Sequence, residues 1–308
     1  MEGAGTDFEV QRGGQHAALL RPIAVQGANE ILKIHGQRAL SRGSVEANNQ
    51  YNWQGLIMVG MHKLVLLIVK TGSSVPEAAE RFGDFDQWFI NSIGRERFDF
   101  RTVSVHQGER LPERRDDLAA VVITGSPAMV SHRHQWSERA AGWIAEAHDE
   151  GLPMLGVCFG HQLIAHALGG VVGPNPNGRR MGSFEVEILD RDDQLLGQFA
   201  PGAAFQATHV EAVLEPPRGA RVISRAQGDP HHGLYFGNYS WGLQFHPEFD
   251  VDIMDCYIRS RRSVLSGEGI FADRLLESLR PTPSGRAVLQ RFAEMVERAE
   301  RGFGPNHS

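Results

Sequence analysis

From about residue 61 onward, the chain alternates between two spacings of apolar residues. Short apolar runs are typical of buried strands, whereas apolar positions three and four residues apart indicate helices. The expected strands cover residues 62–70, 98–105, 121–124 and 153–157. The expected helices cover residues 75–93, 138–148 and 163–168. This alternation predicts an α/β fold with a central, mostly parallel sheet, helices on both faces and a site at the carboxyl ends of the strands.

The pattern changes after Gly170. Apolar and polar residues then alternate over short stretches, which predicts a small antiparallel sheet in addition to the parallel one. These shorter strands are expected at residues 184–189, 221–226, 234–237 and 241–245. Helices are expected again at residues 249–265 and 283–301. The last helix is amphipathic, so it packs either on the body of the protein or on a partner.

Residues 1–60 differ in composition from the rest of the chain. They are rich in Gly, Gln, Asn and Arg, and their apolar residues are scattered. Such a segment buries too little apolar surface to fold, so we expect a disordered leader or an over-extended start, with translation beginning at Met58 or Met61. The rest divides into a main domain at residues 61–265 and a helical extension at residues 266–308.

Composition and charge exclude several classes of protein. Of the 308 residues, 41% are hydrophobic and 22% are charged, as in ordinary globular proteins. The net charge of −6 gives no basis for binding nucleic acid or an anionic membrane. The sequence has no apolar run of about 18 residues and no recognisable secretory signal. We therefore expect a cytoplasmic protein in which Cys158 and Cys256 are both reduced.

Residues 155–162 have the pattern of a nucleophile on a sharp turn between a strand and a helix. Cys158 stands at the join, with Gly156 and Gly160 two residues to either side. Small residues are needed because such a turn strains the backbone and packs it against its neighbours. A buried core cysteine is the alternative, since free cysteines are among the most buried residues. The flanking glycines and the motifs downstream favour the nucleophile.

A general base and its orienting partner are predicted at residues 246–248. Pro247 discourages helix, so His246 and Glu248 point to the same side of an extended segment. A thiol nucleophile needs a base to take its proton and return it to the leaving group. The alternative is a strand-end histidine beside a surface glutamate.

A third element precedes the cysteine. Residues 119–124 form an apolar strand that runs into the turn Gly125-Ser126-Pro127. The backbone N–H groups of Gly125 and Phe159 are candidates to face a developing oxyanion. Taken alone, an ordinary strand-ending turn is the simpler interpretation of this segment.

Together these elements resemble the class I glutamine amidotransferases. That family carries a Gly-x-Cys-x-Gly-x-Gln elbow, a His-Pro-Glu and an upstream oxyanion turn, matched here at residues 156–162, 246–248 and 124–127. The resemblance covers residues 61 to 257 and is strongest to stand-alone members similar to the amidotransferase domain of GMP synthase. It implies the flavodoxin-like class I amidotransferase fold and the hydrolysis of a γ-glutamyl amide through a thioester.

The resemblance also implies roles for single residues. Cys158 would be the nucleophile, His246 the general base and acid, and Glu248 the group that orients the histidine. No metal or organic cofactor is needed for this chemistry. Substrate contacts are expected from the oxyanion turn, the elbow and the loop at residues 174–182, namely at Ser126, Gln162, Met181 and Gly182.

Other polar residues have two interpretations each. Arg179 or Arg180 either meets a substrate carboxylate or belongs to a solvated basic turn. His209 matches a family segment near the site and is a candidate for contact with it. The histidine pairs within residues 132–134 and 231–232 are either metal ligands or parts of solvated polar loops. The loops are favoured, because no cysteine pair or carboxylate framework at metal-ligand spacing joins the histidines.

The sequence therefore predicts a Cys-His-Glu amidohydrolase that cleaves the γ-amide of glutamine or of a related γ-glutamyl compound. A γ-glutamyl peptidase is the alternative among enzymes, and a non-catalytic partner or regulatory subunit is the alternative from another class. The sequence has no Gly-rich ATP-pyrophosphatase loop, so a synthase would be a separate partner. The expected ligand is a small molecule.

Overall fold

The computed structural model describes residues 63–302. The expectations for residues 1–60 therefore lie outside the described residues. The strands are β1 (Val65–Lys70), β2 (Asp99–Ser104), β3 (Leu118–Ile123), β4 (Met154–Val157), β5 (Val171–Pro174), β6 (Arg180–Ile188), β7 (Ala204–His209), β8 (Glu211–Glu215), β9 (Arg221–Ala226), β10 (Asp229–Gly237) and β11 (Ser240–Leu243). The helices are α2 (Pro76–Phe82), α3 (Phe85–Ile93), α4 (Gln135–Asp149), α5 (Phe159–Ala167), α6 (Val251–Ser260), α7 (Arg262–Gly267), α8 (Ala272–Ser278) and α9 (Ser284–Glu300), with 3₁₀ turns η2 (Val105–Gln107) and η3 (Val130–His132).

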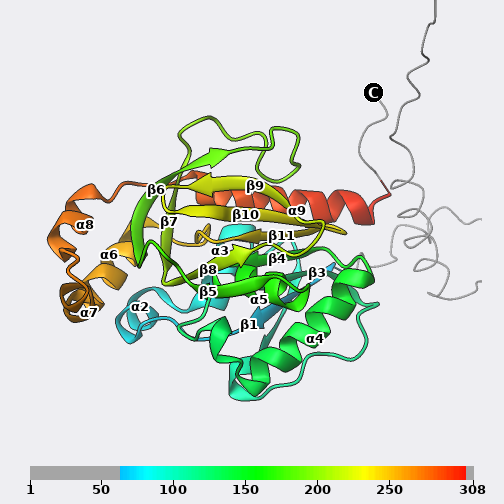
Figure 1. The fold of residues 1–308 in the computed structure, drawn as a ribbon. Coiled ribbons are helices and arrows are strands. Elements are labelled where there is room, and N and C mark those ends of the chain that lie inside the picture. Colours follow the sequence, from blue (N-terminus) through cyan, green and yellow to red (C-terminus); the bar gives the residue numbers. More distant parts are fainter. Residues whose placement is uncertain (1–62, 303–308) are drawn as a thin grey trace, which may run out of the picture. The chain divides into compact units, whose positions relative to one another are not determined.

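Most of the described strands belong to one sheet with the order β2-β1-β3-β4-β11-β10-β9-β6-β7 (Figure 1). The pairings from β2 to β11 are parallel. The pairings from β11 to β7 are antiparallel. The predicted α/β fold is confirmed, although most of the antiparallel strands continue the main sheet. Strands β5 and β8 pair with each other as a separate small antiparallel sheet.

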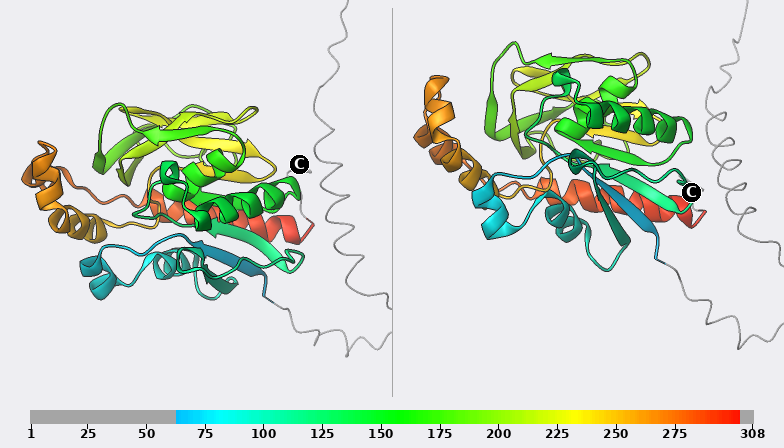
Figure 2. Two further views of the ribbon diagram at one scale, coloured as in Figure 1. Left: turned by 60° about the horizontal axis from the view of Figure 1, so that its bottom comes forward. Right: turned by 90° about the horizontal axis from the view of Figure 1, so that it is seen from below.

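Helices cover both faces of the parallel strands. Successive residues of β1 point to opposite faces of the sheet, and because both sets are apolar, each face is covered by helices. Leu66 and Ile68 belong to a core cluster shared with α3 and α9, whereas Leu67 and Val69 belong to a cluster shared with α4 and α5. The right-hand view of Figure 2 shows these two helix pairs on opposite sides of the blue strand β1. The continuous apolar runs recognised in the sequence are thus the strands buried on both faces.

The helix expected over residues 75–93 is interrupted in the structure. Gly83 has φ 83° and ends α2, and the side chain of Asp84 accepts a hydrogen bond of 2.8 Å from the backbone N–H of Phe85 at the start of α3. A glycine followed by an N-capping aspartate is a stop and a start signal in sequence. The apolar periodicity continued across this break and concealed it.

The C-terminal helix α9 packs on the body of the described residues. Its apolar face, including Val288, Leu289 and Phe292, is buried in the core cluster that also contains α3. Arg97 forms a two-bonded ion pair with Glu297 of α9, at 2.8 and 2.9 Å. The domain boundary at residue 265 stays a prediction. No helix within residues 63–302 is long and apolar enough to cross a membrane.

Candidate active site

Cys158 lies on a strained elbow between β4 and α5. Its φ of 51° and ψ of −103° are unusual for a residue with a side chain. A Cβ atom at Gly156 would collide with the carbonyl of Gly160, and one at Gly160 would collide with the carbonyl of Ile123. Both glycines are therefore required by close backbone approach, and together they hold the elbow against the end of β3.

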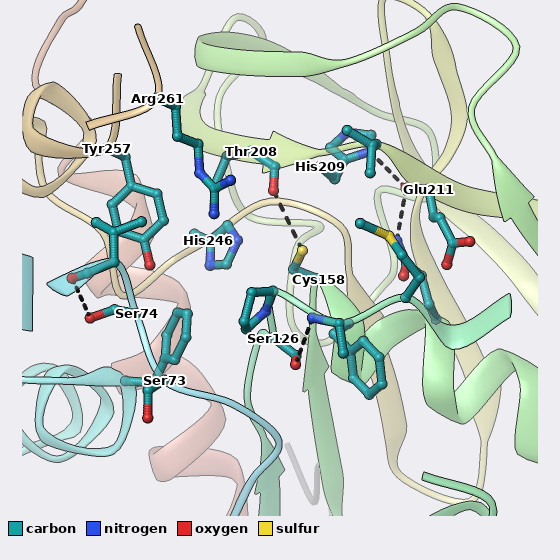
Figure 3. A pocket seen from close by; sticks show the side chains of 18 of the residues that line it. Ser73, Ser74, Ser126, Cys158, Thr208, His209, Glu211, His246, Tyr257 and Arg261 are labelled. Carbon is teal, nitrogen blue, oxygen red and sulfur yellow. Dashed lines mark hydrogen bonds between the residues drawn. The ribbon is translucent and has the colours of Figure 1, made fainter. Parts of the chain in front are cut away.

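His246 is brought to the cysteine by the segment that follows β11. Its backbone N–H donates to the carbonyl of Gln206 at 2.7 Å. Its Nδ1 lies 2.7 Å from Oε1 of Glu248, so Nδ1 carries the proton that the carboxylate accepts. The remaining nitrogen, Nε2, is left for the Cys158 side of the ring, where the two side chains lie next to each other in Figure 3. Cys158, His246 and Glu248 are 7%, 3% and 4% exposed.

The imidazole of His246 packs against two aromatic rings and a glycine. The ring of Phe249 stacks on it with a centroid separation of 4.2 Å, and Phe85 lies at 6.2 Å. A Cβ at Gly125 would lie only 2.8 Å from Cε1 of the imidazole. The predicted oxyanion residue Gly125 therefore packs directly against the histidine.

The electrostatics of His246 favour its protonated form. Burial alone lowers the pKa of His246, because it disfavours the charged ring. The carboxylate of Glu248 and the side chain of Cys158 outweigh burial and raise the pKa to about 10. The carboxylate of Glu248 and the side chain of Cys158 thus both favour the protonated ring that lies beside them.

The ends of β3 and β4 lie together at the predicted oxyanion position. Phe159 is the first residue of α5, so its N–H has no acceptor within the helix. The next N–H, of Gly160, donates to the carbonyl of Thr124 at 3.1 Å and ties the elbow to β3. Ser126 Oγ donates to the carbonyl of Thr71 at 2.8 Å and accepts from the N–H of Ala128 at 3.1 Å. Ser126 thus stabilises the turn that precedes the pocket.

A cavity of about 350 Å³ opens above Cys158 and His246. This volume suits a small molecule. Among the residues predicted from sequence, the cavity wall includes Ser126, Phe159, Gln162, Arg179 and His209. Gln162 is anchored there, because its Nε2 donates to the carbonyl of Glu211 at 2.8 Å and to Oε1 of Gln244 at 3.0 Å.

Two predicted substrate residues, Met181 and Gly182, lie in β6 outside the cavity wall. Met181 is buried in a hydrophobic cluster and pairs with Thr208 of β7, whose carbonyl lies 3.6 Å from Sγ of Cys158. The two residues thus support the strand beside the thiol. A direct contact of Met181 or Gly182 with substrate stays a prediction.

The two candidate arginines of the loop differ. The guanidinium of Arg179 lines the cavity but is engaged by Glu268 through two bonds of 2.7 and 2.8 Å. The guanidinium of Arg180 lies 4.7 Å from the centre of the Phe184 ring. Neither is a free cation at the centre of the cavity.

Sequence analysis missed Arg261, which lies at the break between α6 and α7 and points into the cavity beside His246 (Figure 3). Its neighbours are paired: Arg259 with Asp255 at 2.6 Å and Arg262 with Asp273 at 2.7 Å. Within residues 63–302, no carboxylate lies within ion-pair distance of Arg261. A signal existed in the sequence, because Arg259 has an aspartate four residues earlier, whereas Arg261 has Tyr257 there.

Comparison with known proteins identifies the family to which the chain belongs. The family model described as "Glutamine amidotransferase class-I" matches residues 82–261, which is more than half of the chain. The chain belongs to the class-I glutamine amidotransferase family.

Three relatives and one solved structure illustrate the likeness. The chain is 38% identical to GMP synthase of Aeropyrum pernix over 46% of the chain and 25% of that protein, and 38% identical to a glutamine-hydrolysing GMP synthase subunit of Saccharolobus solfataricus over 42% and 66%. It is 23% identical to γ-glutamyl peptidase 3 of Arabidopsis thaliana over 69% of the chain and 88% of that protein. A glutamine amidotransferase from Thermotoga maritima shares the fold, with a TM-score of 0.63, 22% identity and coverage of 76% and 98%. The matched region therefore spans 25% of the Aeropyrum pernix protein and 66% of the Saccharolobus solfataricus subunit.

Proposed function

We propose that this protein hydrolyses the γ-amide of glutamine or of a related γ-glutamyl compound through a thioester on Cys158. One observation carries the proposal. A cysteine on a strained elbow faces a histidine that a buried carboxylate orients across 2.7 Å. This is the arrangement of nucleophile, base and orienting group that nucleophilic catalysis requires.

The proposed reaction has two halves. As Sγ of Cys158 attacks the γ-carbonyl carbon, the thiol proton resides on Nε2 of His246, and the N–H groups of Gly125 and Phe159 receive the oxyanion. His246 then gives the proton to the leaving nitrogen, and the C–N bond breaks to leave the thioester. Water attacks the thioester carbonyl while His246 accepts its proton and returns it to sulfur. Glu248 stays ionised throughout and holds the ring.

Arg261 supplies the proposed contact for the substrate's α-carboxylate. It is a cation without a carboxylate partner among residues 63–302, and it points into the same cavity as the reacting groups. Arg179 lies in the same wall but is neutralised by Glu268. A guanidinium that binds a carboxylate selects γ-glutamyl compounds over simple amides, because an uncharged amide leaves the cation unpaired.

The leaving group distinguishes two versions of this function. The likeness to γ-glutamyl peptidase 3 covers 88% of that protein and supports cleavage of γ-glutamyl peptides by the isolated chain. The likeness to the GMP synthase subunit of Saccharolobus solfataricus supports a second version, in which a synthase partner receives the ammonia. We favour the free-standing hydrolase, in which helices that follow Phe249 help to enclose the site.

Steady-state kinetics on the isolated chain distinguish these versions. Glutamine and a panel of γ-glutamyl peptides are assayed for release of ammonia or amine, with the Cys158→Ala variant as the blank. Turnover of a γ-glutamyl peptide without any added protein supports the free-standing hydrolase. Negligible turnover of every substrate, with activity appearing only in a co-purified complex, supports the partnered amidotransferase.

A further inference from the structure

Behind the cavity wall, three polar side chains from two strands converge in the protein interior. His209 ends β7, and Asp229 and His232 lie on β10. They are 6%, 2% and 1% exposed. One potential metal-ligand atom from each residue lies within 4.8 Å of those from the other two. The proposed hydrolysis uses none of these three side chains as a reacting group.

One ring nitrogen of His209 is bonded to a backbone carbonyl and the other faces a carboxylate. Nδ1 of His209 lies 2.9 Å from the carbonyl of Glu211, which can only accept, so Nδ1 carries the proton. The other ring nitrogen of His209, Nε2, is buried. This Nε2 has no hydrogen-bond partner and lies 3.8 Å from Oδ2 of Asp229. A buried ring nitrogen without a partner and a carboxylate oxygen that faces it can both bind a cation placed between them.

Asp229 and His232 are the other two members of this cluster of potential metal ligands. Oδ1 of Asp229 accepts from the backbone N–H of His231 at 3.1 Å, which fixes the carboxylate. Oδ2 lies 2.9 Å from Nδ1 of His232 and faces both histidines. Nε2 of His232 is buried without a partner. Among residues 63–302, the buried carboxylate of Asp229 lies within ion-pair distance of these two histidines and of no lysine or arginine.

We propose that His209, Asp229 and His232 form a binding site for a divalent transition-metal ion of the zinc class. Two imidazoles and one carboxylate suit zinc, whereas magnesium and calcium prefer oxygen ligands alone. Ligands bound at about 2.0 Å in a tetrahedral site lie about 3.3 Å apart, so the side chains need only small adjustments. The Nδ1–H···O=C bond of His209 is the second contact that orients metal-binding histidines. Coordination through Nδ1 of His232 would require its proton to move to Nε2 of the same ring, so the ion would bind the other neutral tautomer.

The site joins β7 to β10 directly behind the thiol. His209 follows Thr208, whose carbonyl contacts Sγ of Cys158, and His209 itself lines the cavity. A bound ion would therefore stiffen this wall of the cavity without contributing to the Cys-His-Glu chemistry. The inference does not rest on the proposed function.

The test uses the full chain without a histidine tag. The protein is stripped with a chelator, dialysed against Zn²⁺ and analysed for metal by mass spectrometry, and its Tm is measured with and without Zn²⁺. We expect about one Zn²⁺ per chain and a rise in Tm of several degrees. His232→Gln should lose both effects. The matched control His231→Gln should keep both, because the side chain of His231 faces the carbonyl of Val213 instead of the cluster.

Cobalt gives a readout that does not depend on variants. Co²⁺ bound to the wild-type chain should develop the visible absorption of a four-coordinate nitrogen and oxygen site, and Zn²⁺ should displace it. Zinc content well below one ion per chain with an unchanged Tm would overturn the proposal and leave the cluster as a hydrogen-bonded network. Equal binding by wild type and a folded His232→Gln variant would also overturn it.

Discussion

The backbone N–H of Cys158 donates a hydrogen bond to the carbonyl of Leu243 across 2.8 Å. This bond joins the elbow to the last residue of β11, three residues before His246. Parallel pairing of β4 with β11 therefore brings together a cysteine and a histidine that are 88 residues apart in the chain. The backbone pairing of these two strands is therefore what brings Cys158 and His246 close together.

Replacing glycine by alanine within a helix usually stabilises a protein, but at the elbow we expect the opposite. Gly160 lies within α5, where helix propensity alone favours alanine by roughly 1 kcal/mol. Because a Cβ there collides with the backbone of β3, we expect Gly160→Ala to lower the free energy of unfolding by about 1–3 kcal/mol. Gly142→Ala in α4 is the control, since nothing lies within 4 Å of its added methyl group. In urea unfolding, the free energy of unfolding should be higher than wild type for Gly142→Ala and lower than wild type for Gly160→Ala. A change in the same direction for both variants would refute the packing argument.

The two cysteines predict different chemistry. Cys158→Ala should reduce turnover by several orders of magnitude, because no other group can form the acyl intermediate. Cys256 is buried in a hydrophobic cluster, burial raises its pKa, and Cys256→Ala should leave activity nearly unchanged. Thiol alkylation of the folded protein at neutral pH, followed by peptide mapping, should label Cys158 faster. Equal labelling of both thiols would count against an activated Cys158.

The pair His246–Glu248 predicts a loss of stability as pH rises. A histidine whose pKa is raised in the folded state stabilises the fold fully below the unfolded pKa of 6.5, and this contribution is lost as pH rises toward the folded pKa. The experiment uses a Cys158→Ala background, so that the thiol does not titrate. There, removal of Cys158 takes away one of the two groups that raise the pKa, so the folded pKa is lower than in the wild type and only Glu248 raises it. The unfolding free energy should therefore fall above pH 6.5 over a narrower pH range, by at most about 1.4 kcal/mol per pH unit.

Adding Glu248→Gln to that background should make the unfolding free energy less dependent on pH above pH 6.5, because the neutral amide no longer favours the imidazolium. Chemical unfolding at intervals from pH 6 to pH 9 gives both curves. Parallel curves for the two variants would show that Glu248 does not hold the proton on His246.

Arg261 predicts a defect in substrate binding that its neighbours do not share. Removing a charge-assisted contact costs about 1.5–3 kcal/mol, so Arg261→Gln should lower kcat/KM for γ-glutamyl substrates by roughly 10- to 100-fold. The defect should appear mainly in KM. Arg262→Gln is the matched control, because Arg262 pairs with Asp273 outside the cavity. Equal effects of the two substitutions would remove Arg261 from the proposed carboxylate site.

Local patterns in the sequence predicted the parts of the site that depend on contiguous residues. The elbow glycines and the alternation of His246 with Glu248 are properties of short segments, and the structure places the three side chains of the proposed triad together. The sequence offered only a weak signal for Arg261, the absence of an acidic residue four positions earlier, because its position in the cavity depends on a helix break and on the pairing of the arginines around it.

The histidine pair at residues 231–232 was interpreted wrongly as part of a solvated loop. Asp229, Pro230 and two histidines are typical of a polar turn, but β10 pairs on both sides, with β9 and β11, and His232 is 1% exposed. Its partner His209 lies on another strand, 23 residues earlier in the chain. No spacing rule joins two such residues until the sheet register is known.

The central claim is that Cys158 carries the acyl group. Its most direct test is rapid acid quenching of the protein mixed with glutamine or a γ-glutamyl peptide, followed by proteolysis and mass spectrometry. The account predicts one γ-glutamyl group, sensitive to hydroxylamine, on the peptide that contains Cys158, and none on the Cys158→Ala variant or on the peptide that contains Cys256. Substrate turnover that continues at the wild-type rate in Cys158→Ala, with no acyl group on the wild-type peptide, would contradict it.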